Sequence, residues 1–157
     1  MSSRPESKMN HLERTFESTP QSVQEARGFV TFAVGCHVDT ARSDDIRSCV
    51  SELASNAVLH TEAGAGRYTV KICVDRHGCV RLEVHDQDHV APEASTENSD
   101  RDSTNGRGLF IVEHLSDTWG VEKSPTGKIV WSQFAGETHA GMHNACESSP
   151  GDTAAAA

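Results

Sequence analysis

Two runs of alternating apolar and polar residues, joined by a short turn, constrain the fold of this chain more than any other feature. The runs cover residues 67–75 and 79–86, and Arg76-His77-Gly78 connects them. Alternation with a period of two is the pattern of a half-buried β-strand, and a three-residue connection containing glycine favours a hairpin. We therefore predict an antiparallel pair of strands in which Gly78 takes a positive φ.

The turn also predicts how the two strands face each other. Pairing of residue 75 with residue 79 places Val74 opposite Val80 and Ile72 opposite Leu82, so that one face of the hairpin is apolar. The same alternation puts Asp86 on this apolar face, at the end of the second strand. A carboxylate that points toward the covering layer is a candidate for ligand binding.

Two segments before the hairpin carry apolar residues at the spacing of amphipathic helices, after an expected edge strand over 12–17. Thr19-Pro20 is a typical helix start, and Ser43, followed by two aspartates, is expected to cap the second helix. That helix should end near Thr61. Its expected apolar stripe consists of Ile46, Cys49, Val50, Leu53 and Ala57.

The remaining elements follow the hairpin. Residues 87–105 contain almost no large apolar side chain, and a connection of this length is expected to be either disordered or a mobile lid. Gly106-Arg107-Gly108 then opens a short helix, and residues 119–122 and 128–134 form a closing pair of strands. The prediction is an α+β fold: a two-layer sandwich of a mixed, mostly antiparallel sheet with helices on one face.

Composition narrows the domain organisation and the classes of function. The 157 residues suit one domain, with a folded region over 11–134 and disordered segments over 1–10 and 135–157. A formal net charge of −9 argues against binding to nucleic acid, and no apolar run is long enough to cross a bilayer. Five scattered cysteines indicate a reducing compartment, so we expect a cytoplasmic protein.

Two pairs of residues are candidates for catalysis or ligand binding, and each pair also has a purely structural interpretation. Glu52 and Asn56 are four residues apart on the second helix, so they could offer a general base and an oxygen ligand for Mg²⁺ to one substrate. Such a pair alone is more often a solvated helix flank. Gly106 and Gly108 open a helix, where free amide groups favour phosphate, but a Gly-x-Gly alone is more often only a turn.

Taken in order along the chain, these features resemble a known superfamily. The stretch Glu52-Leu53-Ala54-Ser55-Asn56-Ala57-Val58-Leu59-His60 resembles the N box of the GHKL ATPases. Val84-His85-Asp86 resembles their adenine box, and Gly106-Arg107-Gly108-Leu109-Phe110-Ile111-Val112 resembles their second glycine box. With Trp119-Gly120-Val121 and Gly127-Lys128-Ile129-Val130-Trp131, residues 16–134 are most similar to the actinobacterial relatives of the anti-sigma factor serine kinases.

The resemblance implies a site for ATP and Mg²⁺ and a role for each matching residue. Glu52 would be the catalytic base that activates a serine hydroxyl, Asn56 the Mg²⁺ ligand, and Asp86 the acceptor for the adenine amino group. The second glycine box would hold the phosphates; its nucleotide-binding residues are Asn105, Gly106, Arg107, Gly108 and Leu109. Phosphoryl transfer needs mainly positioning and charge neutralisation, so all these groups are expected to face one cavity.

Two positions depart from the family pattern, both on the adenine side. Asp88 stands where relatives usually have a glycine that approaches the base, and Ile129 stands where many have a threonine that joins the adenine hydrogen-bond network. Because Glu52 and Asn56 are intact, we expect ATP binding that depends on Mg²⁺ but is weak, with a relaxed choice of nucleotide.

Two functions follow from the resemblance, and the sequence leaves both open. The first is a serine/threonine kinase that phosphorylates an anti-anti-sigma antagonist protein, since Glu52 is needed mainly where a hydroxyl is deprotonated. The second is an ATP-binding regulator that sequesters a sigma factor or another protein without phosphoryl transfer. A homodimer is implied by the resemblance alone.

Overall fold

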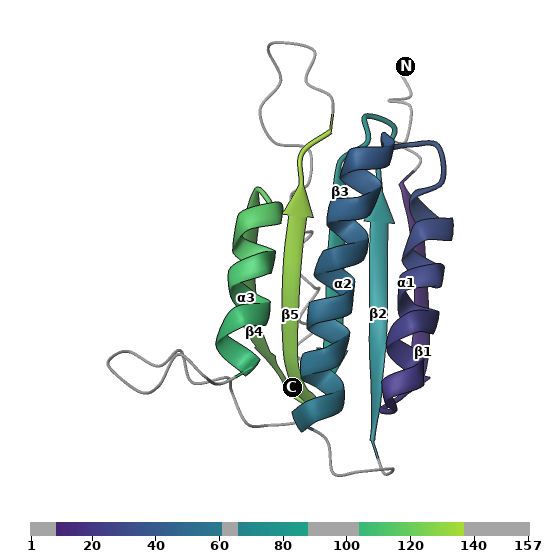
Figure 1. Ribbon diagram of the computed structural model, residues 1–157. Coiled ribbons are helices and arrows are strands. Elements are labelled where there is room, and N and C mark those ends of the chain that lie inside the picture. The colour runs from purple at the N-terminus through teal and green to yellow at the C-terminus, as the bar shows by residue number, and fades with distance from the viewer. Residues whose placement is uncertain (1–8, 61–65, 88–103, 137–157) are drawn as a thin grey trace, which may run out of the picture.

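The computed structural model describes residues 9–60, 66–87 and 104–136, which form five strands and three helices (Figure 1). The predictions for the two ends of the chain and for most of the segment 87–105 lie outside these ranges. In chain order the elements are β1 (Asn10–Glu17), α1 (Pro20–Val34), α2 (Thr40–His60), β2 (Arg67–Val74), β3 (Val80–Asp86), α3 (Thr104–Leu115), β4 (Thr118–Ser124) and β5 (Gly127–Phe134).

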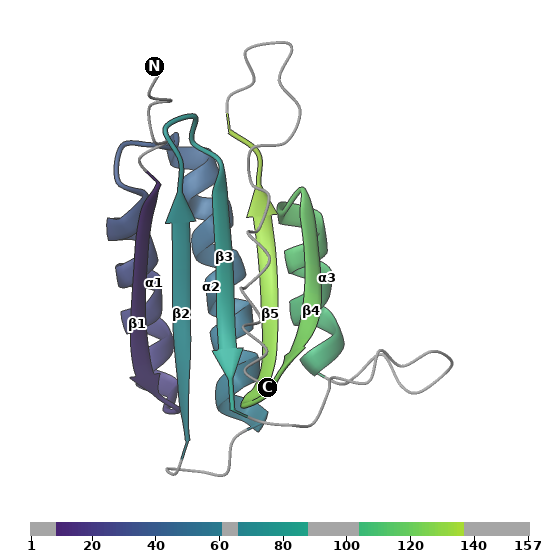
Figure 2. The same cartoon turned by 180° about the vertical axis from the view of Figure 1, so that it is seen from behind.

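The strands form one sheet in the order β1-β2-β3-β5-β4, and each neighbouring pair is antiparallel. All three helices cover the same face of this sheet, as the two opposite views show (Figures 1 and 2). The predicted α+β sandwich with helices on one face is therefore confirmed. The sheet is antiparallel throughout its described strands, rather than mixed.

The hairpin of β2 and β3 adopts the predicted register, in which Val74 pairs with Val80. Gly78 has a φ of 76°, and a Cβ atom there would lie 2.7 Å from the backbone oxygen of His37. Both the conformation and the close approach therefore require glycine. Oδ1 of Asp75 accepts hydrogen bonds from two backbone N–H groups of the turn, at 2.8 and 2.9 Å, which fixes its shape.

The hydrophobic core lies between the sheet and the helices, with α2 between α1 and α3 (Figure 1). The whole predicted apolar stripe of α2 is buried in it. Burial of one such aliphatic side chain contributes about 1.5–3 kcal/mol, so this central helix anchors the layer above the sheet. The largest fully buried side chains include Tyr68, Phe134, Ile46, Leu53, Ile72 and Leu82.

The starts of the first two helices are set by capping side chains. α1 begins directly after Thr19, whose hydroxyl caps it as the sequence indicates. α2 begins at Thr40, because Oδ1 of Asp39 accepts a hydrogen bond from the backbone N–H of Arg42 at 2.7 Å. The prediction that Ser43 caps α2 was wrong: an equally good capping residue stands one turn earlier, and no helix breaker separates the two.

The other helix boundaries lie close to those predicted. α2 ends at His60, and α3 begins at Thr104, two residues before the glycine pair that was expected to open it. Within the described ranges, no helix is long and apolar enough to span a membrane.

Candidate functional site

The packing of α3 on α2 brings three of the predicted site residues together. A Cβ atom placed on Gly108 would lie 2.8 Å from Oε2 of Glu52 and 3.6 Å from Oδ1 of Asn56. Both polar side chains are partly buried and face the backbone of α3, so they do not form a freely solvated helix flank. Two oxygen ligands thus converge on the start of a neighbouring helix, and the lack of a side chain at position 108 makes room for them.

Four chain segments meet at the end of the molecule where this contact lies. They are the last turns of α2, the start of α3, the end of β3 and the start of β5 (Figure 1). Asp86 is the last residue of β3 and is 5% exposed on the helix-covered face, as its alternation with Val84 predicts. The structure therefore places the buried carboxylate at the same end of the sheet as the glycines of α3.

The first turn of α3 contains Asn105, Gly106 and Arg107. The first amide groups of a helix lack acceptors within the helix and lie at the positive end of its dipole, so an anion placed there meets several donors. Leu109, on the next turn, is partly buried and packs against the hydrophobic core. Its side chain therefore also holds α3 in place.

The register of β5 overturns one interpretation made from the sequence. Ile129 pairs with His85, whereas Lys128 pairs with Asp86 and is 6% exposed on the helix-covered face. Because successive residues of a strand point to opposite faces, the side chain of Ile129 points away from that of Asp86. Ile129 therefore does not stand in the position of a residue that joins a hydrogen-bond network with Asp86; Lys128 does.

Lys128 is the residue of this region that the sequence analysis missed. Its placement follows from the alternation that leads back from Phe134 through Val130, both of which are core residues. The period of two that placed Asp86 on the inner face also places Lys128 there. The sequence therefore contained the signal for the face on which Lys128 lies, but not for its pairing with Asp86.

The described residues fit a nucleotide with a bound Mg²⁺. The oxygens of Glu52 and Asn56 are of the hard kind that Mg²⁺ prefers, alongside phosphate oxygens. The lack of a Cβ atom at Gly108 lets these two side chains lie close to the backbone of α3. Asp86 adds an acceptor of hydrogen bonds at the same end of the sheet.

His85 lies on the other face of the sheet and belongs to a separate polar cluster. Its Nε2 atom is 2.7 Å from Oε2 of Glu83, and Nε of Arg81 donates to Oε1 of Glu83 at 2.7 Å. The hydrogen bond with His85, followed by the interactions with Arg81, lowers the pKa of Glu83 to about 2, although burial opposes the shift. Arg81 also lies over Trp131, 4.5 Å from the ring centroid. This cluster stabilises the outer face of the sheet.

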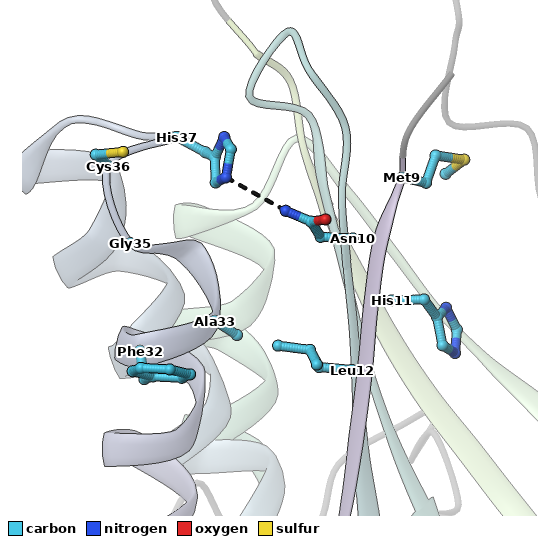
Figure 3. Close-up of a pocket in the computed structure, with 9 residues that line it drawn as sticks. All are labelled: Met9, Asn10, His11, Leu12, Phe32, Ala33, Gly35, Cys36 and His37. Carbon is cyan, nitrogen blue, oxygen red and sulfur yellow. Dashed lines mark hydrogen bonds between the residues drawn. The ribbon is translucent and has the colours of Figure 1, made fainter. Parts of the chain in front are cut away.

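A surface hollow of about 570 Å³ lies away from the candidate site, between the start of β1 and the end of α1 (Figure 3). Its lining residues are Met9, Asn10, His11, Leu12, Phe32, Ala33, Gly35, Cys36 and His37. The start of β1 and the end of α1 lie at the opposite end of the sheet from the start of α3 (Figure 1). The hollow is therefore not part of the candidate site.

The fold defines a two-layer α+β domain with polar groups of α2 and α3 in contact at one end, and comparison with known sequences identifies the family. The histidine kinase-like ATPase domain matches residues 16–134. This match covers most of the chain and all the residues of the candidate site. The chain belongs to the histidine kinase-like ATPase domain family, whose members are ATP-binding domains.

A solved structure shares the fold. The chain that contains the RsbU and RsbW domains of Rv1364c from Mycobacterium tuberculosis matches with a TM-score of 0.59 and 21% sequence identity. The match covers 80% of the present chain and 32% of that chain, so the present chain spans about a third of its relative's length. No curated protein matches the sequence.

Proposed function

We propose that this protein is an ATP-dependent serine/threonine kinase that phosphorylates a small antagonist protein of the anti-anti-sigma type. The observation that carries the proposal is the convergence of Glu52 and Asn56 on Gly108, with Glu52 Oε2 2.8 Å from where a Cβ atom would stand. This arrangement puts a base and a metal ligand beside a helix start suited to phosphate. A domain that only bound ATP would not need the base.

In this proposal each residue has a separate task. Glu52 accepts the proton of a serine hydroxyl on the partner protein. The serine oxygen then bonds to the γ-phosphorus of ATP, while the bond between that phosphorus and the bridging oxygen breaks and ADP leaves. Asn56 supplies an oxygen ligand to Mg²⁺, which offsets the charge on the phosphates. The phosphates are oriented by the backbone amides of Asn105, Gly106 and Arg107. Asp86 accepts a hydrogen bond from the amino group of the adenine ring.

The partner and the setting belong to the same proposal. The relative from Mycobacterium tuberculosis carries its RsbW domain with an RsbU domain in one chain. For the present chain we propose a cytoplasmic partner that presents a serine on a protein surface, and a homodimer as the working assembly. Light scattering of the purified protein, with and without Mg-ATP, measures whether it is a homodimer.

A second function is favoured by the surface of the protein outside the candidate site. Phe32 is 81% exposed and lines the hollow beside β1, together with the exposed side chains of Met9 and Leu12. Exposed apolar groups of this kind are typical of protein contacts. The alternative is therefore an ATP-binding regulator that sequesters a sigma factor without phosphoryl transfer.

Transfer of label from [γ-³²P]ATP to candidate antagonist proteins tests the two functions. Glu52→Gln should abolish transfer while keeping nucleotide binding, because glutamine has nearly the same shape but cannot accept the proton. Glu113→Gln, at an exposed position of α3, is the matched control and should transfer label normally. Transfer that survives Glu52→Gln contradicts the role of Glu52 as the base, and absence of transfer by the wild type contradicts the kinase proposal. Partner binding without any transfer supports the alternative.

A further inference from the structure

A lysine stands directly beside the acid that is proposed to bind the nucleobase. Lys128 is the cross-strand partner of Asp86 in the β3–β5 pair, and both are nearly fully buried on the helix-covered face, at 6% and 5% exposure. Side chains directly opposite each other in antiparallel strands have Cβ atoms about 4.5–5.5 Å apart. The base-binding end of the site therefore contains an ammonium group as well as a carboxylate.

The neighbouring strand places a second lysine beside Lys128. Lys123 of β4 is the cross-strand partner of Lys128 on its other side, and it is exposed. Like charges directly opposite each other repel, whereas opposite charges attract. Lys128 thus has a repulsive neighbour at the edge of the sheet and an attractive neighbour, Asp86, toward its centre.

The start of β5 is also held tightly against the end of β3. A Cβ atom on Gly127 would overlap the backbone oxygen of Asp86, so only glycine permits this approach. Lys128 follows Gly127 directly. Its backbone is therefore fixed relative to that of Asp86, so the lysine and aspartate side chains start from neighbouring points on the helix-covered face.

A lysine beside an aspartate changes which bases the site can accept. Adenine presents an amino donor at position 6, which a carboxylate binds, whereas guanine and hypoxanthine present a carbonyl acceptor there, which a carboxylate repels. An ammonium group is a donor only and complements that carbonyl. We propose that Lys128 is a specificity-determining residue that lets the site bind 6-oxopurine nucleotides as well as ATP, an inference that rests on the proposed nucleotide site.

Titration calorimetry of the full chain with Mg-ATP, Mg-GTP and Mg-ITP tests this inference. The wild type should bind all three with dissociation constants within about tenfold of one another. Lys128→Met removes the donor but keeps much of the length of the side chain, and it should weaken GTP and ITP at least about tenfold relative to ATP. Lys123→Met, on the neighbouring strand, should leave the ratio unchanged, which separates specific donation from general loss of positive charge.

The outcomes distinguish this inference from the proposed function. A wild type that binds ATP but excludes both GTP and ITP overturns the role of Lys128 and leaves the ATP site standing. An unchanged ratio in Lys128→Met also overturns it. A wild type that binds no nucleotide overturns both proposals. If Lys128→Met fails to fold, Lys128→Arg, which keeps a donor, should retain the wild-type ratio, and a tenfold loss of GTP relative to ATP there overturns the inference.

Discussion

Gly108 of α3 stands so close to Glu52 of α2 that a Cβ atom at position 108 would lie 2.8 Å from Oε2 of the carboxylate. The Gly108→Ala variant should therefore displace the tip of the Glu52 side chain. We expect phosphoryl transfer to fall at least about tenfold, because the proposed base moves. The fold should persist, because the displaced atoms are the far end of a flexible side chain. Transfer of label from ATP to the antagonist protein measures the loss, and circular dichroism checks the fold.

Gly28 provides the matched control for this substitution. It lies on the exposed side of α1, and a Cβ atom there would meet nothing within 4 Å. Gly28→Ala should therefore stabilise the protein by about 0.5–1 kcal/mol, because alanine loses less conformational freedom in a helix, and it should leave phosphoryl transfer unchanged. Equal losses of transfer in both variants would contradict the role assigned to Gly108.

The start of α2 gives a prediction about stability alone. Asp39 accepts the hydrogen bond that caps the helix, at 2.7 Å from the backbone nitrogen of Arg42, and Ser43 lies inside the first turn. Asp39→Ala should cost about 1 kcal/mol, whereas Ser43→Ala should change stability by less than about 0.5 kcal/mol. Urea unfolding followed by circular dichroism decides between the two residues, and the reverse order would reinstate Ser43 as the cap.

The buried hydrogen bond between Ser22 and Tyr68 predicts that removing one partner costs more stability than removing the other. The two hydroxyl oxygens are 2.8 Å apart, and Oγ of Ser22 also donates to the backbone oxygen of Thr19 at 2.7 Å. Ser22→Ala should cost about 1–3 kcal/mol, because it leaves the buried hydroxyl of Tyr68 unpaired, whereas Tyr68→Phe should cost about 0.5–1.5 kcal/mol. Denaturant unfolding of both variants measures the difference, and an equal or reversed cost would contradict it.

The elements of the fold were predictable because each has a strong local cause. The hairpin register follows from the alternation and from the turn at Gly78, and the stripe of α2 follows from helical spacing. The cap of α2 was misplaced because Asp39 and Ser43 are both good capping residues, and local chemistry alone cannot rank them.

The site was predictable only in part, because its contacts are long-range. The spacing of Glu52 and Asn56 showed that they share a flank, but only the packing of α3 shows that Gly108 faces them. Lys128 was overlooked for a different reason: its role depends on which strand pairs with β3, and β5, rather than the chain neighbour β4, lies there.

The outer face of the sheet predicts a dependence of stability on pH. The hydrogen bond with His85 lowers the pKa of Glu83 from 4.5 to about 2. A carboxyl group whose pKa is lower in the folded state stabilises the protein above its unfolded pKa, and this contribution disappears as the pH falls from about 4.5 to about 2. Above pH 5, Glu83→Gln should therefore be less stable than the wild type, by at most about 3 kcal/mol.

The difference in unfolding free energy between the wild type and Glu83→Gln reports on Glu83 alone, because the other carboxyl groups titrate in both proteins. This difference should shrink steadily below pH 4.5 and vanish near pH 2. Glu13→Gln is the control, since this carboxylate is 58% exposed and lies 3.6 Å from Nζ of Lys71, so its removal should have a small effect at every pH. Urea unfolding from pH 2 to pH 7 gives both profiles, and a constant difference between wild type and Glu83→Gln would show that hydrogen bonding to His85 does not hold Glu83 ionised.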